Sequence, residues 1–267
     1  MPLFEIVVLA VVQGITEFLP ISSSGHLRLA SEALGLSENT LILDVAVHVG
    51  TLFAVMAYFW RDLVFMFVGL FDTVRGRKHD GGRLAGYLFV ATIPIIVAGY
   101  YAQELIENHL RTLEIVGWTT IGFGILLYLA DRAGMTILKL DHLTIPHALL
   151  VGFAQVLSLV PGTSRAGITI TAARFLGYDR REAARFSMLM SIPAIAGAGL
   201  LIGLRLIETG NPVLTRDALI AAGLSFLTAL AAIALFLRWL RFAGFGPFVI
   251  YRLALGAVIL GWVYGAF

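Results

Sequence analysis

Two polar runs interrupt long apolar stretches of this chain, and they constrain its fold more than any other feature. Residues 13–26 read QGITEFLPISSSGH, and residues 161–169 read PGTSRAGIT. Aligning Gly25 with Gly167 brings further identities into register, namely Ser22 with Ser164, Ala30 with Ala172, and Leu34-Gly35 with Leu176-Gly177. Internal symmetry of this kind is typical of membrane proteins built from two related halves. The pattern therefore predicts a duplicated membrane protein.

Composition agrees with a membrane location. Of the 267 residues, 59% are hydrophobic and 13% are charged, and the mean hydropathy is +0.89. A soluble domain carries about 25% charged residues. A net charge of only +2 without a long basic run argues against nucleic acid as a partner. The absence of cysteine excludes disulfides and thiolate chemistry, and no basic residue precedes Arg28, so no cleaved signal peptide is expected.

Six stretches are long and apolar enough to cross a bilayer, which takes about 17–25 residues. They lie near 42–60, 84–103, 115–131, 185–206, 217–237 and 246–266. Two further apolar regions, 1–36 and 144–177, are broken near the middle by the proline-containing polar runs. Proline removes a backbone donor, and irregular backbone at membrane depth survives only where protein or a wet cavity surrounds it. Both regions are expected to form re-entrant helical hairpins.

The distribution of positive charge predicts the orientation, because short cytoplasmic loops hold an excess of Lys and Arg. Thirteen of the 19 basic residues fall on one side, namely Arg61, Arg75, Arg77, Lys78, Arg83, Arg132, Lys139, Arg174, Arg180, Arg181, Arg185, Arg238 and Arg241. That side is expected to be cytoplasmic, with the first hairpin and both termini outside. The fold predicted is one all-α polytopic membrane domain, 1–267, in which halves 1–131 and 144–267 form an inverted-topology repeat.

Residue types at the two breaks indicate the ligand. Ionisable side chains at membrane depth cost roughly 2.5–3.5 kcal/mol each, so Glu17 and Arg165 are expected to face a polar cavity. Small residues at the start of a helix form anion sites, and a guanidinium suits phosphate oxygens. Gln13 and Glu17 lie four apart and share a helix face. Hydroxyl, carboxylate, imidazole and guanidinium groups together provide the parts for phosphoryl transfer.

Both runs resemble signatures of the undecaprenyl-diphosphate phosphatase family, the bacitracin-resistance type. Residues 13–26 are similar to its pattern of Glu or Gln, Gly, any, Thr-Glu-Phe-Leu-Pro, any, Ser-Ser, any, Gly-His. Residues 161–169 are similar to its Pro-Gly, any, Ser-Arg-Ser, any, any, Thr pattern, and the similarity extends through the whole chain. The resemblance implies release of the terminal phosphate of undecaprenyl diphosphate, which recycles the lipid carrier of cell-wall synthesis. It also implies the bacterial cytoplasmic membrane and a site that opens to the outer side.

The resemblance also implies roles for single residues. Glu17 would be the essential carboxylate, Ser23 the nucleophile, His26 a general acid or base and Arg165 the phosphate clamp. The substrate would also meet Gln13, Ser22, Ser24, Gly25, Gly162, Thr163, Ser164 and Thr169.

Two departures from the family pattern limit the assignment of these roles. Gln13 stands where many relatives have Glu and cannot act as a base, and Ala166 lacks the hydroxyl usual after the Ser-Arg pair.

The resemblance also implies a cation and partners. A divalent cation, Mg or Ca, would be bound mainly by substrate phosphates, with Glu17 as the protein ligand. Polyprenyl diphosphate and membrane lipids are the implied partners, and a homodimer is left open.

Structural readings stand beside these roles. Ser22, Ser24, Ser164 and Thr169 could bond only to backbone, and His26 could be a buried histidine bonded to a carbonyl. Arg165 could serve only to pair with Glu17. Asp44 and His48 are either partners of the site or a solvated edge, and Arg252 is expected to snorkel or to pair structurally. A lipid-phosphate flippase is the functional alternative, because a fold does not determine a function.

Overall fold

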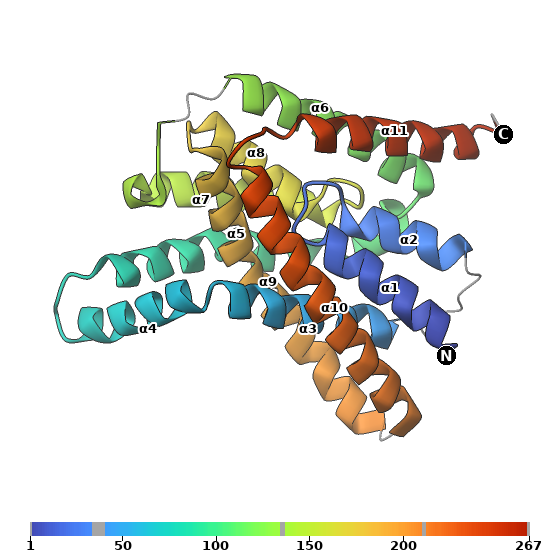
Figure 1. Ribbon diagram of the computed structural model, residues 1–267, viewed down its shortest axis with the longest axis horizontal. Coiled ribbons are helices and arrows are strands. Elements are labelled where there is room, and N and C mark those ends of the chain that lie inside the picture. The colour runs from blue at the N-terminus through green and yellow to red at the C-terminus, as the bar shows by residue number, and fades with distance from the viewer. Residues whose placement is uncertain (1, 34–40, 134–136, 210–211, 266–267) are drawn as a thin grey trace.

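The computed structural model describes residues 2–33, 41–133, 137–209 and 212–265, without the side chains of residues 28, 31–33, 41, 42, 103, 107 and 198–215. In these ranges every regular element is a helix (Figure 1). The helices are α1 (Leu3–Thr16), α2 (Ser23–Ala33), α3 (Leu41–Tyr58), α4 (Trp60–Val74), α5 (Asp80–His109), α6 (Leu113–Ala133), α7 (Ile145–Val156), α8 (Arg165–Phe175), α9 (Arg180–Thr209), α10 (Pro212–Trp239) and α11 (Gly246–Val263). Two short 3-10 turns, η2 (Leu140–His142) and η3 (Leu157–Leu159), flank α7.

Four helices of the described part are long and apolar enough to cross a membrane. They cover Asp80–Ala102, Leu113–Ala133, Arg216–Trp239 and Gly246–Val263. These ranges coincide with four predicted spans, 84–103, 115–131, 217–237 and 246–266. An all-helical, multi-pass membrane protein is thereby confirmed. The predicted span 185–206 lies in α9, and its side chains beyond 197 lie outside the described residues.

The region predicted as one span at 42–60 has a different shape. At Phe59 the chain bends by 76° and continues as α4, where the sequence predicted a cytoplasmic loop. Asp62, one of the charged residues that indicated the end of the span, forms an ion pair with Arg185 of α9. Its charge is therefore neutralised close to the bend. Gly69 and Gly82 permit close packing of α4 on α5, because a Cβ at Gly69 would lie 2.2 Å from the nitrogen of Gly82. The two helices form a hairpin at the left of Figure 1.

Both polar runs form a break between two helices, as predicted for regions 1–36 and 144–177; residues 34–36 lie outside the described ranges. Ser22 and Ser164 directly precede α2 and α8, with φ angles of 72° and 70°. They alone among the described non-glycine residues have positive φ. The hydroxyl of Ser22 accepts from the N–H of Gly25 at 3.4 Å, and that of Ser164 accepts from Gly167 at 3.1 Å. The aligned serines therefore cap their helices in the same way.

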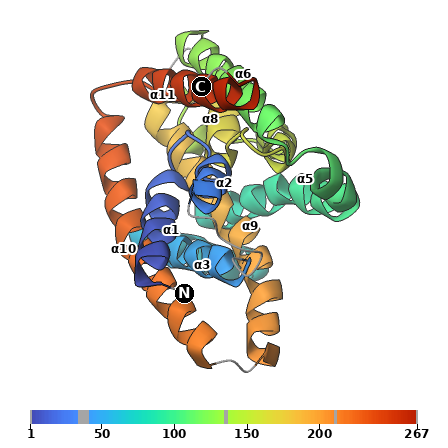
Figure 2. The ribbon, with the colours of Figure 1, turned by 90° about the vertical axis from the view of Figure 1, so that its right-hand side faces the viewer.

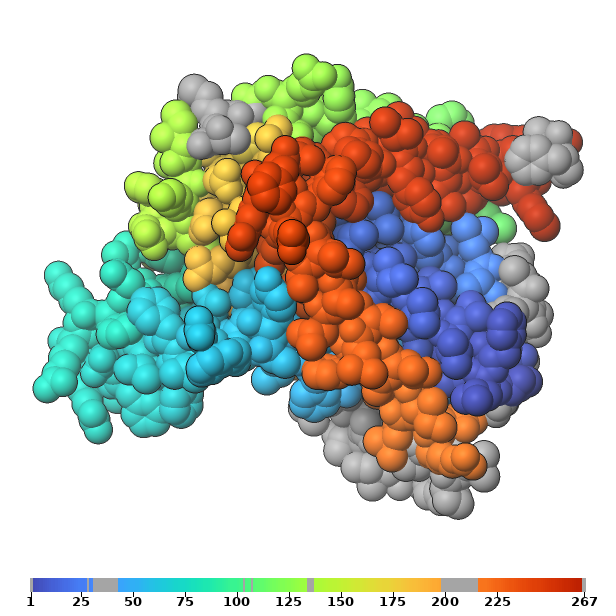
Figure 3. Space-filling view, viewed as in Figure 1, coloured from blue at the N-terminus to red at the C-terminus, as the bar shows by residue number. Residues whose placement is uncertain are grey.

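The breaks are held between layers of helices. α6 and α11 lie side by side as the upper layer in Figures 1 and 2. α8 packs against α6, α7 and α9. In Figure 3, α10 crosses one face of the molecule beside α1.

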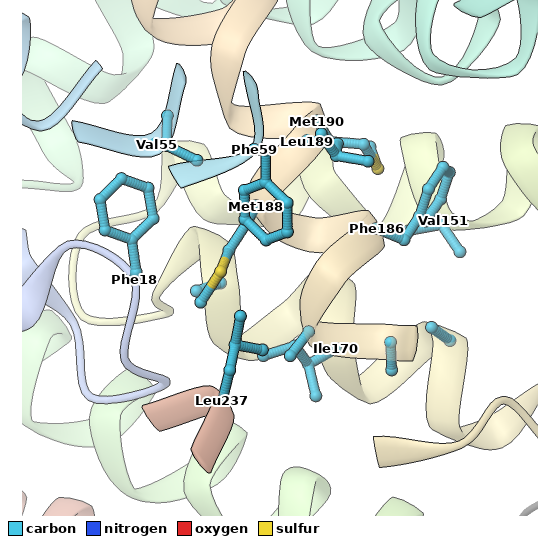
Figure 4. Close-up of a cluster of buried hydrophobic side chains, with 14 of the residues drawn as sticks. Phe18, Val55, Phe59, Val151, Ile170, Phe186, Met188, Leu189, Met190 and Leu237 are labelled. Carbon is cyan, nitrogen blue, oxygen red and sulfur yellow. The ribbon is translucent and has the colours of Figure 1, made fainter. Parts of the chain in front are cut away.

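Phe18 anchors the first break in the hydrophobic core. It lies in the cluster of Figure 4 near Val55 of α3 and Met188 of α9, and it is only 1% exposed. Burying an aromatic side chain of this size stabilises the fold by roughly 1.5–3 kcal/mol. The residue before it, Glu17, is thereby held inside the protein, where its side chain is 6% exposed.

Candidate active site

The carboxylate of Glu17 is the point at which the two polar runs meet. Its Oε1 accepts a hydrogen bond from Nη2 of Arg165 at 2.5 Å. Its Oε2 accepts from the hydroxyl of Ser23 at 2.9 Å and from Nε2 of Gln13 at 2.7 Å. The structure thus brings together three of the four predicted catalytic residues, and the carboxylate, hydroxyl and guanidinium are close enough to exchange a proton or share a charge.

Local backbone geometry explains the convergence. The chain turns after α1 with a hydrogen bond from the N–H of Ile21 to the carbonyl of Leu19, and α2 starts at Ser23. Arg165 is likewise the first residue of α8. The first amides of a helix have no carbonyl partner within it and carry the positive end of the helix dipole. Each break therefore offers backbone donors beside its reactive side chain, which favours an anion between them.

Several buried polar atoms at the breaks have no hydrogen-bond partner in the described part of the chain. They include Nη1 of Arg165, Oγ1 of Thr163 and Oε1 of Gln13. Leaving a buried polar atom unpaired costs about 1–3 kcal/mol, so such atoms suit a ligand that supplies the partner. The guanidinium of Arg165 consequently keeps a donor, Nη1, that its ion pair with Glu17 does not use. Oxygens of a phosphate match the free donors on Arg165 and Thr163.

His26 is held apart from the Glu17 cluster. Its Nδ1 lies 2.7 Å from the carbonyl oxygen of Ser22, and its Nε2 lies 2.6 Å from the hydroxyl of Tyr251 on α11. The structure gives it no hydrogen bond to Ser23 or Glu17. The hydrogen bond to a carbonyl, which was the structural alternative for His26, is present. The imidazole also contacts α11 through Tyr251.

The other predicted substrate-binding residues divide into two groups. Ser22 and Ser164 cap helices, and Thr169 donates to the carbonyl of Arg165 at 2.8 Å and contacts the hydroxyl of Ser187 at 2.7 Å. These three hydroxyls have structural partners. Ser24 is exposed, with its hydroxyl 3.3 Å from that of Ser22, and Gly25 is buried in the first turn of α2. Gly162 has a φ of 91°, which favours glycine.

His48 reaches the site from α3. Its Nε2 lies 3.8 Å from Oε2 of Glu17, and its Nδ1 lies 2.5 Å from the backbone carbonyl of Asp44. The sequence left open whether these two residues were partners of the site. The structure places His48 beside the carboxylate, and Oδ1 of Asp44 is buried without a hydrogen-bond partner.

Arg252 was expected to snorkel or to pair structurally, and it does not snorkel. Its side chain is fully buried and donates to backbone carbonyls of both breaks and of α6. The acceptors are Pro20 at 3.2 Å, Thr163 at 3.0 Å, Gly162 at 3.0 Å, Thr120 at 3.0 Å and Thr119 at 3.4 Å. A Cβ at Gly167 would lie 2.9 Å from its Nη1. An arginine within an apolar span was the available signal, but its acceptors could not be read from the sequence.

A resident metal does not fit the described residues, because no group of three or more His, Cys, Asp or Glu side chains is placed to hold one. Glu17 has only His48 beside it among such side chains. We therefore assign no step to a protein-bound metal.

The sequence matches known proteins over almost its whole length. Residues 6–258 match the family described as bacitracin resistance protein BacA. The chain is 50% identical to the undecaprenyl-diphosphatase of Jannaschia sp. strain CCS1 over 262 residues, which cover 97% of this chain and 98% of that protein. It is 48% identical to the undecaprenyl-diphosphatase of Ruegeria pomeroyi over 266 residues, which cover 99% of this chain and 100% of that protein. It is 50% identical to the undecaprenyl-diphosphatase of Hahella chejuensis over 263 residues, which cover 98% of each chain. With a match over nearly its whole length, the chain belongs to the BacA bacitracin resistance protein family.

Proposed function

We propose that this chain is an integral-membrane phosphatase that hydrolyses undecaprenyl diphosphate to undecaprenyl phosphate and inorganic phosphate. The observation that carries the proposal is the meeting of the Ser23 hydroxyl and the Arg165 guanidinium on the Glu17 carboxylate. The relatives that share about half of its residues are named undecaprenyl-diphosphatases. The activity would recycle the lipid carrier for cell-wall synthesis. The flippase alternative gains no support from these names.

In the proposed mechanism Ser23 attacks the terminal phosphorus while Glu17 takes the hydroxyl proton. The bond between that phosphorus and the bridging oxygen breaks, and undecaprenyl phosphate leaves. Water then cleaves the phosphoserine, which releases inorganic phosphate and restores the hydroxyl of Ser23. Arg165 and the first amides of α2 and α8 stabilise the charge that spreads over the phosphoryl oxygens. His26 serves as the acid or base for the leaving group or the water through its Nε2, which exchanges its bond to the Tyr251 hydroxyl for one to the reacting oxygen.

Release of phosphate from purified protein in detergent tests this function. We expect turnover of C15 and C55 diphosphates without any membrane gradient, which a flippase would not give. Repeating the assay with a chelator tests whether a divalent cation, bound mainly through the substrate phosphates, takes part. Lack of phosphate release from both lipids under all these conditions would contradict the proposal.

Serine variants test the nucleophile. Ser23→Ala should abolish turnover, whereas Ser22→Ala and Ser24→Ala should only reduce it, because Ser23 alone of the three donates to Glu17. Since a nucleophile acts in the chemical step, Ser23→Ala should still bind the lipid diphosphate within about tenfold of the wild-type affinity. More than a few per cent residual turnover would favour direct attack by water activated by Glu17 or His26.

The proposal includes six spans and two re-entrant hairpins in an inverted-topology repeat, with the site open to the outer side of the bacterial cytoplasmic membrane. The matching caps of Ser22 and Ser164 and the asymmetry of Lys and Arg support it. A cysteine at His79 should be labelled only from the cytoplasm and one at Asn108 only from outside. Reversed labelling would contradict this orientation. A homodimer remains a prediction that the molar mass in detergent tests.

A further inference from the structure

Tyr251 contacts the candidate site from outside both polar runs. Its hydroxyl lies 2.6 Å from Nε2 of His26, and the two rings are nearly parallel, with centroids 5.5 Å apart and an interplanar angle of 6°. The ring is 44% exposed, so it is not a core residue held mainly by packing. Its best-defined polar contact in the structure is the imidazole of His26.

The two contacts of the imidazole determine its tautomer. A backbone carbonyl can only accept, so Nδ1 of His26, 2.7 Å from the carbonyl oxygen of Ser22, carries a proton. In the neutral ring Nε2 is then an acceptor, and the hydroxyl of Tyr251 must donate to it. Ser22 and Tyr251 together hold the ring from both nitrogens.

The position of Tyr251 is set by its neighbour in the chain. Arg252 is fully buried and donates to carbonyls in both breaks, among them Pro20 and Thr163. These bonds fix the register of α11 against the turn that precedes α2, the helix on which His26 lies. The tyrosine hydroxyl is thus presented by an anchored helix, which holds a contact more accurately than a loop does.

We propose that Tyr251 is a positioning residue of the phosphatase site, whose hydroxyl orients His26 and keeps its Nε2 as the acceptor. The inference rests on the proposed function and extends the site to α11. Removal of the hydroxyl leaves Nε2 without its donor, so only the carbonyl of Ser22 still holds the ring. A neutral ring held at one nitrogen can rotate away from that carbonyl, and the tautomer with the proton on Nε2 then becomes accessible.

Tyr251→Phe tests the inference, because it keeps the ring and removes only the hydroxyl. Tyr264→Phe is the matched control, since the hydroxyl of Tyr264, just beyond α11, donates to the exposed Glu114 at 2.6 Å. We expect Tyr251→Phe to lower kcat about tenfold with KM within about twofold, a part of the effect of a general acid or base. The control should keep both constants within about twofold.

Nitrogen NMR of labelled protein gives a readout that does not depend on turnover, with the His26 signals assigned by their loss in His26→Gln. Wild type should show His26 protonated at Nδ1, and Tyr251→Phe should show a mixture of tautomers. Either an unchanged tautomer or an unchanged kcat in Tyr251→Phe overturns the inference. If wild type releases no phosphate, the proposed function fails by itself, and the tautomer still decides whether Tyr251 positions His26.

Discussion

Ser23 and Arg165 are the first residues of two helices that follow equivalent turns, and both reach the carboxylate of Glu17. The backbone of the two turns is alike, since a serine with positive φ caps each helix. The side chains that the turns present are not alike. The first turn presents a hydroxyl and an imidazole, and the second presents a guanidinium. The two turns thus share a backbone geometry while they present different chemical groups to Glu17.

Burial also distinguishes the helices that follow the two turns. α8 is buried at every residue from Ala166 to Arg174, enclosed by α6, α7 and α9. In α2, by contrast, Ser24 is exposed and His26 is half-buried. The helix after the second turn is therefore enclosed, whereas the helix after the first turn is partly accessible. Under the proposed function, we expect variants at the two turns to differ in kind.

After the loss of turnover expected for Ser23→Ala, the next largest effect should come from Arg165, whose fork has no equivalent at the first turn. Arg165→Ala should lower kcat/KM by about 10³-fold, because arginines that neutralise a transferring phosphoryl group contribute factors of this size. Arg165→Lys should lose most of the activity as well, since a point charge cannot replace two parallel donors. Near-normal turnover in the Lys variant would mean that the site requires only a positive charge at position 165, and not the two parallel donors of arginine. Loss of folded protein in both variants would instead favour a purely structural pair with Glu17.

Glu17→Gln should follow in size. The amide keeps the shape of the side chain but cannot take the proton of Ser23, so kcat should fall by about 10²-fold or more. The control is Glu114→Gln, which changes an exposed carboxylate outside the breaks and should leave kcat unaltered. If Glu17→Gln retains a tenth or more of wild-type kcat, another group accepts the proton and the assignment of Glu17 as base is wrong.

Alanine substitutions at glycines of the two breaks test how tightly each break is packed, with the free energy of unfolding as the measurement. A Cβ at Gly162 would lie 2.1 Å from Oγ1 of Thr119, at a residue whose φ of 91° is unfavourable for alanine. Gly162→Ala should cost about 2 kcal/mol or more in the free energy of unfolding in detergent. A Cβ at Gly25 would meet its nearest atom at 3.5 Å, an ordinary contact, so Gly25→Ala should unfold like wild type. Equal destabilisation by both substitutions would contradict the difference in packing between the two breaks.

The capping serines should give the smallest effects. Ser164→Ala removes a cap worth about 1 kcal/mol. Ser22→Ala should cost less, because its cap bond is 3.4 Å long compared with 3.1 Å for Ser164. Replacement of either serine by glycine should cost less than replacement by alanine, since glycine relieves the positive φ. Chemical unfolding in detergent measures all four variants, and alanine variants as stable as the glycine variants would argue against strain at these turns.

Local sequence patterns predicted the breaks, because proline, glycine and serine act within a few residues of one another. The contact of Glu17 with Ser23 and Arg165 also follows from two motifs in the sequence. The sequence did not predict the bend at Phe59, because Arg61 and Asp62 are charged residues of the kind that end a span. Only the structure shows that Asp62 pairs with Arg185 of α9, which lies far away in the sequence. The partners of Tyr251 and Arg252 lie far away in the chain, and neither periodicity nor a motif indicates which groups they meet.

The bonds of Arg252 have a consequence for the order of events during synthesis. α11 follows every other described helix in the chain, yet its guanidinium ties Pro20 of the first break to Gly162 and Thr163 of the second. The earlier helices can enter the bilayer before α11 leaves the ribosome, but the two breaks lack a common tether until it arrives. A nascent chain halted before α11 would therefore be inserted but unable to turn over substrate. Under the proposed function, competence would thus be acquired only when α11 has docked against both breaks.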